Sequence, residues 1–357
     1  MGSKEIISFY KDKKVFLTGH TGFKGSWMLA LLNIFGAKVC GYSLMPPSEK
    51  NMYEAINGDS LCISNIGDIS DYDNLSKAVT NFQPEIVIHM AAQPIVLNSY
   101  KNPKYTYQTN IMGTVNILEA VRKTKSVRSF VNVTTDKVYE NNNSGKDFAE
   151  SNALGGFDPY SNSKACSDLI TKSYRNSFFN TENYDKHKTS MAICRAGNVL
   201  GGGDWAEKRI IPDCARAAIM GNILEVRSPD AIRPWQHVLE PVYMYLKIAM
   251  LGFNSKNYSD EYNIGPDISQ CRPVIDILKL FQKYWGGLNY EINEDKNKLH
   301  EAEILKLDTT KARNILGYKP IFDIEKTIRS CVEWYRADSE GKDMLKFTKM
   351  QIEEFLQ

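Results

Sequence analysis

The stretch VFLTGHTGFKGSWML, from Val15 to Leu29, decides the fold. A short apolar run enters three glycines, Gly19, Gly22 and Gly25, and an apolar-periodic segment follows them. This glycine spacing between a strand and a helix allows a tight turn, close approach of the backbone to a pyrophosphate and close packing of the helix on the sheet. The helix N-terminus then offers free N–H groups and a positive dipole end to phosphates. The stretch therefore predicts a dinucleotide-binding turn.

The first half of the chain alternates between buried strands and amphipathic helices. Apolar runs predict strands at residues 14–18, 38–42, 85–90, 130–134 and 190–196. Helical periodicity predicts helices at residues 26–35, 106–122 and 161–175. Strands that alternate with helices favour a parallel sheet covered on both faces. We therefore expect an α/β fold with a doubly wound parallel sheet of the Rossmann type.

The pattern changes after Ala196, where a glycine-rich stretch is followed by shorter elements. We expect residues 1–196 to form a dinucleotide-binding domain, to which residues 239–265 return. Residues 197–357 are expected to form mainly a smaller, mixed α/β substrate-binding domain. Helices are predicted at residues 212–220, 240–252, 274–284 and 324–335, and a strand at residues 261–264.

Composition and charge exclude several classes of protein. The formal charge is +2, from 44 basic and 42 acidic residues, which gives no bulk attraction for nucleic acids or membranes. The seven cysteines are scattered without a CxxC pair, as in reduced cytoplasmic proteins. The five histidines form no metal-binding motif, so we expect no catalytic metal. No apolar run is long enough to span a bilayer.

The predicted second strand lacks a residue that such nucleotide sites normally carry. An acidic side chain at its end would bind the adenosine ribose, but the strand ends at Gly41, Tyr42 and Ser43. Asp68 and Ile69, which follow the next strand, are candidates to flank the adenine. An ordinary surface aspartate explains Asp68 equally well.

The sequence YSNSK places Tyr160 and Lys164 four residues apart, on one face of a predicted helix. A nearby ammonium favours the tyrosinate, so the phenol can act as a base nearer neutral pH. The pair follows Thr134, Thr135 and Asp136 at the end of a strand. Catalytic residues of doubly wound sheets lie at such strand ends.

A family resemblance joins these features. The segments TGHTGFKG, VIHMAAQP, TTDKVY, YSNSK, RAGNVLGGGDWAEKRIIPD and AIRPWQHVLEP resemble the extended short-chain dehydrogenase/reductases that modify nucleotide-sugars. The resemblance runs from about residue 12 to residue 335. Within that family, GGGDW and RPWQHVLEP point to the 4,6-dehydratases whose substrate is CDP-glucose.

The resemblance implies NAD as cofactor and an internal redox reaction that removes water. Tyr160 would take the proton of the sugar 4-hydroxyl while the C4 hydride passes to NAD+. Lys164 would hold the nicotinamide ribose and lower the pKa of Tyr160, and Thr135 would hydrogen-bond the 4-oxygen. Asp136 would be the acid for the departing 6-hydroxyl. The hydride would then return to C6, giving a 4-keto-6-deoxy sugar.

One position departs from the better-known dTDP-glucose relatives, which carry Asp-Glu where this chain carries Asp136-Lys137. In those relatives the glutamate removes the C5 proton. A neutral Lys137 could be the base, whereas a charged one could only stabilise the enolate. A structural ion pair between Lys137 and Asp136 is the alternative.

The resemblance also assigns the remaining residues of the site. The cofactor set is Gly19, Thr21, Gly22, Phe23, Lys24, Gly25, Ser43, Asp68, Ile69, His89, Ala91, Ala92, Thr109, Tyr160 and Lys164. The substrate set is Gln93, Asn198, Arg209, Arg233, Trp205 and His237, with the two arginines on the pyrophosphate because Arg forms forked bonds to phosphate. Surface salt bridges are the alternative for the arginines, and core packing is the alternative for Trp205.

Two other functions stay open at this point. A 4-epimerase or a 4,6-dehydratase for another nucleotide-sugar would keep Tyr160 and Lys164, but an epimerase has no use for an acid–base pair at C5 and C6. A silent dinucleotide-binding module would not need both residues. The resemblance further implies a homodimer or homotetramer, paired through the predicted helices at residues 106–122 and 161–175.

Overall fold

The computed structural model describes residues 3–141, 147–267, 270–293 and 305–357. A seven-stranded sheet forms its centre, and all its neighbouring strands run parallel. From one edge to the other the strands are β11 (Glu261–Ile264), β6 (Ser190–Ala196), β5 (Ser129–Val133), β4 (Ile86–His89), β1 (Lys14–Thr18), β2 (Lys38–Ser43) and β3 (Ile63–Ile66). The order reverses between β1 and β4, where doubly wound sheets bind ligands. The predicted fold class is confirmed.

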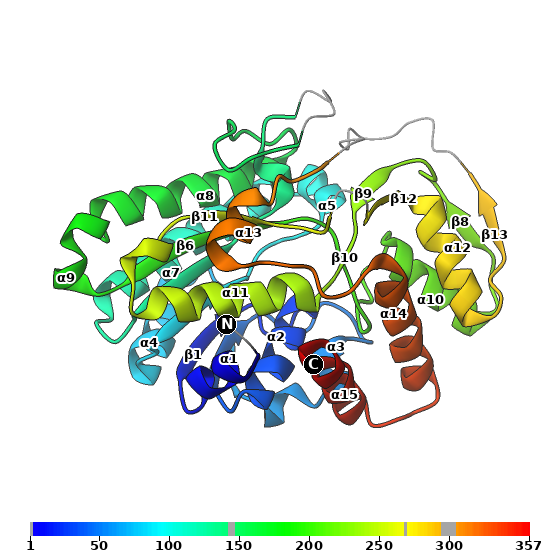
Figure 1. Cartoon of the computed structure of the whole chain (residues 1–357), viewed down its shortest axis with the longest axis horizontal. Coiled ribbons are helices and arrows are strands. Elements are labelled where there is room, and N and C mark those ends of the chain that lie inside the picture. Colours follow the sequence, from blue (N-terminus) through cyan, green and yellow to red (C-terminus); the bar gives the residue numbers. More distant parts are fainter. Residues whose placement is uncertain (1–2, 142–146, 268–269, 294–304) are drawn as a thin grey trace.

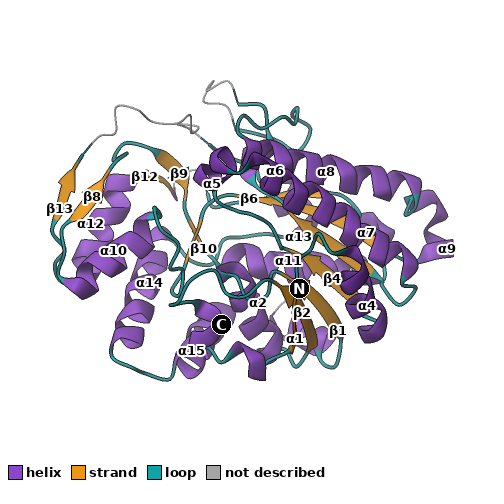
Figure 2. Cartoon of the chain, turned by 180° about the vertical axis from the view of Figure 1, so that it is seen from behind, coloured by secondary structure: helices purple, strands orange, loops and turns teal. Residues whose placement is uncertain are grey.

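Helices cover both faces of this sheet (Figures 1 and 2). The helices α2 (Phe23–Ile34) and α11 (Leu239–Phe253) pack on one face, and α4 (Tyr72–Phe82), α7 (Gly113–Lys123) and α8 (Pro159–Ser177) pack on the other. Successive strand residues point to opposite faces, so Val15 and Leu17 join one hydrophobic core while Phe16 joins the other. Burial on both faces explains the uninterrupted apolar runs of these strands.

The predicted helix at residues 106–122 is helical throughout but is not a regular α-helix. The chain forms α6 (Pro103–Tyr107), one π-helical stretch (Gln108–Met112) and then α7. Gly113 begins α7 close to Ile69, and a Cβ at Gly113 would lie 2.6 Å from the Ile69 Cγ2 atom. The irregular stretch carries Thr109 and Asn110, both buried. Such π-helical insertions occur frequently at functional sites.

A smaller group of elements lies beside the sheet, at one end of the molecule (Figure 1). Here β8 (Leu224–Val226) pairs with β13 (Tyr290–Ile292), and β9 (Ile232–Pro234) pairs with β12 (Cys271–Pro273). The helices α10 (Ile210–Met220), α12 (Val274–Trp285) and α14 (Ile324–Ser339) pack around them. The remaining helices of more than one turn are α1 (Ser3–Tyr10), α5 (Val96–Lys101), α13 (Thr310–Leu316) and α15 (Met344–Leu356).

Two later segments pack with the first half of the chain. Strand β11 pairs with β6, and α11 packs against β5 and β6. The C-terminal α15 packs against α2, and the Ser3 hydroxyl donates to the Leu356 carbonyl at 2.8 Å. The domain division expected from the sequence stays a prediction. Among the described helices, none has the length and apolarity needed to cross a membrane.

Candidate active site

A cavity of about 1310 Å³ opens along the carboxyl ends of the sheet strands and reaches the smaller group of elements. It brings together most residues that the sequence predicted for cofactor and substrate. These are Gly19, Thr21, Gly22, Phe23, Lys24, Gly25, Ser43, Asp68, Ile69, Ala91, Ala92, Thr109, Thr135, Lys137, Tyr160, Lys164, Asn198, Arg209 and Arg233.

The glycine turn at one end of the cavity requires glycine at two positions. Gly19 has a φ of 80°, in the left-handed region that favours glycine. Gly25 lies so close to the turn that a Cβ there would be 2.0 Å from the Gly19 carbonyl oxygen. Gly22 is the N-cap residue of α2, whose first turn carries no acidic residue. The turn and the helix end therefore form a cradle suited to a pyrophosphate.

The neighbouring wall, at the end of β2, is polar but uncharged. The Thr21 hydroxyl lies 2.9 Å from the Ser43 hydroxyl and donates to the Leu44 carbonyl at 2.8 Å. Asp68 lines the cavity and accepts a hydrogen bond from the Ser70 N–H at 2.8 Å. The acidic residue that normally ends this strand is absent, as the sequence indicates.

Helix α8 presents Tyr160 and Lys164 to the cavity. Asp158 caps its N-terminus by accepting from the Ser161 N–H at 3.0 Å, and Pro159 begins the helix. The Lys164 ammonium donates to the Val133 carbonyl at the end of β5, at 2.7 Å. Burial and, to a smaller extent, the positive charge of Lys24 lower the pKa of Lys164 to about 7, and the negative charge of Asp168 acts in the opposite direction.

The Tyr160 phenol faces the strand-end segment that follows β5. Burial raises its pKa, while the positive charge of Lys137 and a hydrogen bond with Thr135 act against that increase. Among the cations that act on the Tyr160 pKa, Lys137 thus has the largest effect and Arg209 a smaller one. The expected effect of Lys164 on the phenol stays a prediction. A further positive charge in the cavity would favour the tyrosinate.

Asp136 and Lys137 form an ion pair at the cavity wall. Asp136 is fully buried, and its Oδ1 atom accepts from the Thr135 hydroxyl at 2.9 Å and from the Lys137 ammonium at 3.1 Å. Lys137 also donates to the Asn198 Oδ1 atom at 3.3 Å. The second Asp136 oxygen, Oδ2, has no partner among the described residues and faces Gly197, where a Cβ would lie 2.9 Å away. Asp136 thus lies directly behind the lining, across a residue without a side chain.

Cationic side chains gather at the other end of the cavity. Arg209 forms an ion pair with Asp204 at 2.8 Å, and this pair raises its pKa. Arg233 is buried and donates to the Ile232 carbonyl at 3.0 Å. Both arginines line the cavity together with Asn198. Guanidinium groups and an amide are suited to a diphosphate linked to a sugar.

Besides Asp136, four predicted residues do not line the cavity. His89 is buried, with Nδ1 2.8 Å from the Thr18 hydroxyl and Nε2 3.2 Å from the Thr114 hydroxyl. Its side chain points into the helical layer because it is the last residue of β4 and lies on that face of the sheet. Gln93 donates to the Thr106 hydroxyl at 2.9 Å and so orders the loop after β4.

Trp205 and His237 are the other two. The Trp205 ring lies edge-on to Tyr335, with centroids 5.1 Å apart, and Lys50 lies over it. His237 is fully buried edge-on to Trp27, with centroids 5.6 Å apart. Both side chains fill space between packed elements, which is the alternative that the sequence left open for Trp205.

Two parts of this region were not predicted from the sequence. Residues 224–231 line the cavity ahead of Arg233, yet nothing in their composition marks them. Asp168 and Arg195 form a fully buried ion pair beneath the site. The spacing of Asp168, one helical turn after Lys164, was the available signal for the second part.

Comparison with known proteins decides the family. The family model described as GDP-mannose 4,6 dehydratase matches residues 16–331. The chain belongs to that family. Within the described residues, no group of three or more His, Cys, Asp or Glu side chains is placed to hold a metal ion.

Two dehydratases are similar to the chain along nearly its whole length, and a solved dehydratase structure has the same fold. The chain is 42% identical to a CDP-glucose 4,6-dehydratase of Salmonella typhimurium, over 98% of each chain. It is 26% identical to a dTDP-glucose 4,6-dehydratase of the same species, over 93% of this chain and 95% of that one. The dTDP-glucose 4,6-dehydratase DesIV of Streptomyces venezuelae, solved with NAD bound, has a TM-score of 0.76 at 21% identity and covers 93% of this chain and 99% of its own.

Proposed function

We propose that this chain is an NAD-dependent CDP-glucose 4,6-dehydratase, which converts CDP-glucose to CDP-4-keto-6-deoxyglucose and water. The observation that carries the proposal is the 42% identity to the Salmonella CDP-glucose 4,6-dehydratase over 98% of each chain. The site supports it independently, because Tyr160, Thr135 and Lys137 meet at one cavity that also holds a phosphate cradle and two arginines.

The residues at the glycine turn fit NAD. A Cβ at Gly25 would occupy the space beneath the turn, so the cradle depends on its glycines. Lys164 and Tyr160 line the same cavity as the cradle, where the nicotinamide end would lie. When bound, NAD+ accepts the hydride from C4 of the sugar and later returns it to C6.

The side chains of the chain then carry the protons. Tyr160 takes the proton of the 4-hydroxyl, and Thr135 holds the resulting 4-oxygen by a hydrogen bond. The 4-ketone makes the C5 proton acidic, and Lys137 receives it. Asp136 gives a proton to the departing 6-hydroxyl, so that water leaves. A solvent-derived proton is finally added at C5. Atoms balance, because one water is lost and the cofactor ends in its starting state.

The Asp136–Lys137 pair argues against 4-epimerisation, the alternative function. An epimerase returns the hydride to C4 and removes no proton from C5. Here an acid and a base lie 3.1 Å apart next to the Tyr160 phenol, where elimination across C5 and C6 needs both.

We propose a cytoplasmic homo-oligomer as the working form. Helices α7 and α8 lie side by side on one face of the sheet, and the surrounding surface exposes Met112, Leu169 and Phe178. These apolar side chains fit a second copy of the chain. Sedimentation would give a dimer or tetramer mass, and a Leu169→Glu variant would reduce it to the monomer mass.

An isotope experiment tests the reaction itself. CDP-glucose with deuterium at C4 is converted in ordinary water, and the product is analysed by NMR. The proposal predicts deuterium at C6 of that product. Unlabelled CDP-glucose converted in D2O is predicted to carry deuterium at C5. Deuterium retained at C4 of an epimerised sugar would overturn it in favour of a 4-epimerase.

A further inference from the structure

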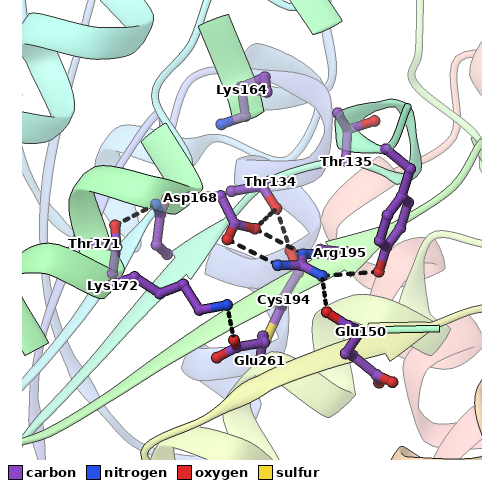
Figure 3. A network of polar contacts seen from close by, with 12 residues as sticks. Thr134, Thr135, Glu150, Lys164, Asp168, Thr171, Lys172, Cys194, Arg195 and Glu261 are labelled. Carbon is purple, nitrogen blue, oxygen red and sulfur yellow. Dashed lines mark hydrogen bonds and ion pairs between the residues drawn. The ribbon is translucent and has the colours of Figure 1, made fainter. Parts of the chain in front are cut away.

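A fully buried ion pair lies beneath the site and takes no part in the proton transfers. Arg195 on β6 donates to both carboxylate oxygens of Asp168 on α8, Nε to Oδ2 at 2.7 Å and Nη2 to Oδ1 at 2.9 Å. Neither side chain is exposed. Figure 3 shows the two groups facing each other between the strands and α8, with Thr134 beside them. A forked pair of this kind fixes geometry as well as charge.

The third nitrogen of the same guanidinium reaches a different segment. Arg195 Nη1 donates to the Tyr139 hydroxyl at 2.9 Å and to the Glu150 carbonyl at 3.1 Å. The Tyr139 hydroxyl donates in turn to the Asn263 Oδ1 atom on β11, at 2.6 Å. Tyr139 ends the short helical turn that contains Asp136 and Lys137. One guanidinium therefore contacts the helix that carries Tyr160 and the turn that carries Lys137.

We propose that Asp168 and Arg195 are positioning residues, which hold the Tyr160–Lys164 helix in register with the Asp136–Lys137 turn. The proposal rests on the proposed function. The pair touches neither reacting atoms nor cavity, so it acts through the residues it holds. Burying two charges costs free energy even when they are paired. Apolar side chains could join the helix to the strand equally well, so packing alone does not explain why this pair is charged.

The charges around Lys164 give the pair its electrostatic effect. The positive charge of Lys24 on α2 disfavours the ammonium form of Lys164, and neutral His89 on β4 interacts electrostatically with Lys164. Asp168, on the same helix as Lys164, is the negative group that acts against burial and Lys24. Tyr160 has a different set of neighbours, namely Lys137, Asp136 and Arg209. Loss of the Asp168 charge should therefore change the pKa of Lys164 more than the pKa of Tyr160.

The test compares four variants with the wild-type chain. Asp168→Asn removes the charge and leaves Arg195 buried without a counterion, whereas the double variant Asp168→Asn/Arg195→Gln removes both charges. Tyr139→Phe removes only the hydroxyl that Arg195 contacts. Glu261→Gln is the matched control, because buried Glu261 joins β11 to Lys172 and Arg175 of the same helix, away from the cavity.

Two readouts separate positioning from a merely structural role. The first is the pH profile of kcat with CDP-glucose. The second is the titration of the Lys164 13Cε resonance in the free enzyme, assigned by its loss in Lys164→Arg. We expect Asp168→Asn to move both to lower pH, so that the ratio of kcat at pH 8 to kcat at pH 6.5 falls about tenfold. Both readouts of the double variant should lie between those of Asp168→Asn and those of the wild type, because the double variant lacks the unpaired Arg195 charge.

The remaining variants complete the comparison. Tyr139→Phe lowers kcat by about tenfold without moving the Lys164 titration, since it loosens the turn and changes no charge. Glu261→Gln lowers the melting temperature and moves neither readout. The proposal would be overturned if Lys164 titrated as in the wild type in the folded Asp168→Asn variant or in the folded double variant. It would also be overturned if Glu261→Gln shifted the Lys164 titration and the pH profile of kcat as much as Asp168→Asn does. The titration needs no substrate, so a wild-type chain without dehydratase activity refutes the proposed function separately.

Discussion

The Lys137 ammonium lies 3.1 Å from the Asp136 carboxylate, and that carboxylate is fully buried. One proton can occupy either side of such a pair. On the lysine it gives an ion pair, and on the aspartate it gives a neutral acid beside a neutral base. The neutral arrangement is what elimination of water across C5 and C6 requires.

Replacement of Lys137 tests this pairing. Lys137→Arg keeps a cation that cannot give up its proton, and Lys137→Met removes the charge. We expect both variants to lose about 10²–10⁴-fold in kcat and to accumulate reduced cofactor with the 4-ketosugar, because oxidation at C4 does not need a C5 base. Absorbance of the reduced nicotinamide and deuterium exchange at C5 are the measurements. Exchange at C5 that persists in Lys137→Arg would show that the residue is only an electrostatic stabiliser.

The Tyr160 phenol should ionise at lower pH when the oxidised cofactor binds. Burial raises the pKa of Tyr160, and the positive nicotinamide ring favours the tyrosinate. The measurement is the tyrosinate absorbance of the wild type minus that of Tyr160→Phe, titrated with NAD+ and with NADH. We expect NAD+, but not NADH, to shift the ionisation of Tyr160 to lower pH. Tyr160→Phe should also lose about 10²–10⁴-fold in kcat. Equal transitions with both cofactor forms would contradict the assignment of Tyr160 as base.

Gly25→Ala should abolish cofactor binding and destabilise the fold. Its Cβ would lie 2.0 Å from the Gly19 carbonyl oxygen, so the turn must move, and we expect a loss of about 1–3 kcal/mol in the free energy of unfolding. Gly221→Ala is the control. Gly221 has a φ of 68°, which favours glycine, but a Cβ there would have open space around it. It should lose about 1 kcal/mol and keep its cofactor affinity, measured by calorimetry. Unchanged affinity in Gly25→Ala would remove the glycine turn from the site.

Glu240 on α11 predicts a stability change with pH. Burial raises its pKa to about 7, while its Oε1 atom accepts from the Ile321 and Phe322 N–H groups at 2.8 and 2.7 Å. The folded protein thus binds more protons than the unfolded chain between pH 4.5, the ordinary pKa of a glutamate, and about pH 7. The stabilisation is complete below that window and falls as pH rises through it, by about 3 kcal/mol. Glu240→Gln keeps the acceptor oxygen and should lose this slope, relative to wild type, in denaturant unfolding at pH 5 and pH 8.

The strands of the sheet were predictable because burial on both faces leaves a continuous apolar run, as in β1 and β6. Elements with a weak or irregular apolar pattern were harder to predict. Helix α4 escaped prediction because only Leu75 and Val79 of its residues are buried, so its apolar face is narrow. The π-helical stretch before Gly113 depends on packing against Ile69, which no local pattern records.

Site residues near strand ends were predictable in position but not in direction. His89 and Ala91 both follow from the end of β4, yet the His89 ring points into the helical layer while Ala91 lines the cavity. Trp205 and His237 lie in the motifs that carried the resemblance, and the structure shows both as packing residues. The buried Asp168–Arg195 pair joins residues 27 positions apart, and only the fold brings them together.

The most direct measurement is turnover of a panel of nucleotide-sugars by the purified chain with catalytic NAD+. CDP-glucose, dTDP-glucose, GDP-mannose and UDP-glucose are incubated separately, and the products are read by mass spectrometry. We predict the loss of one water from CDP-glucose alone, with no net NADH. Loss of water from another nucleotide-sugar in its place would contradict the assigned substrate, and no loss from any of the four would contradict the dehydratase itself.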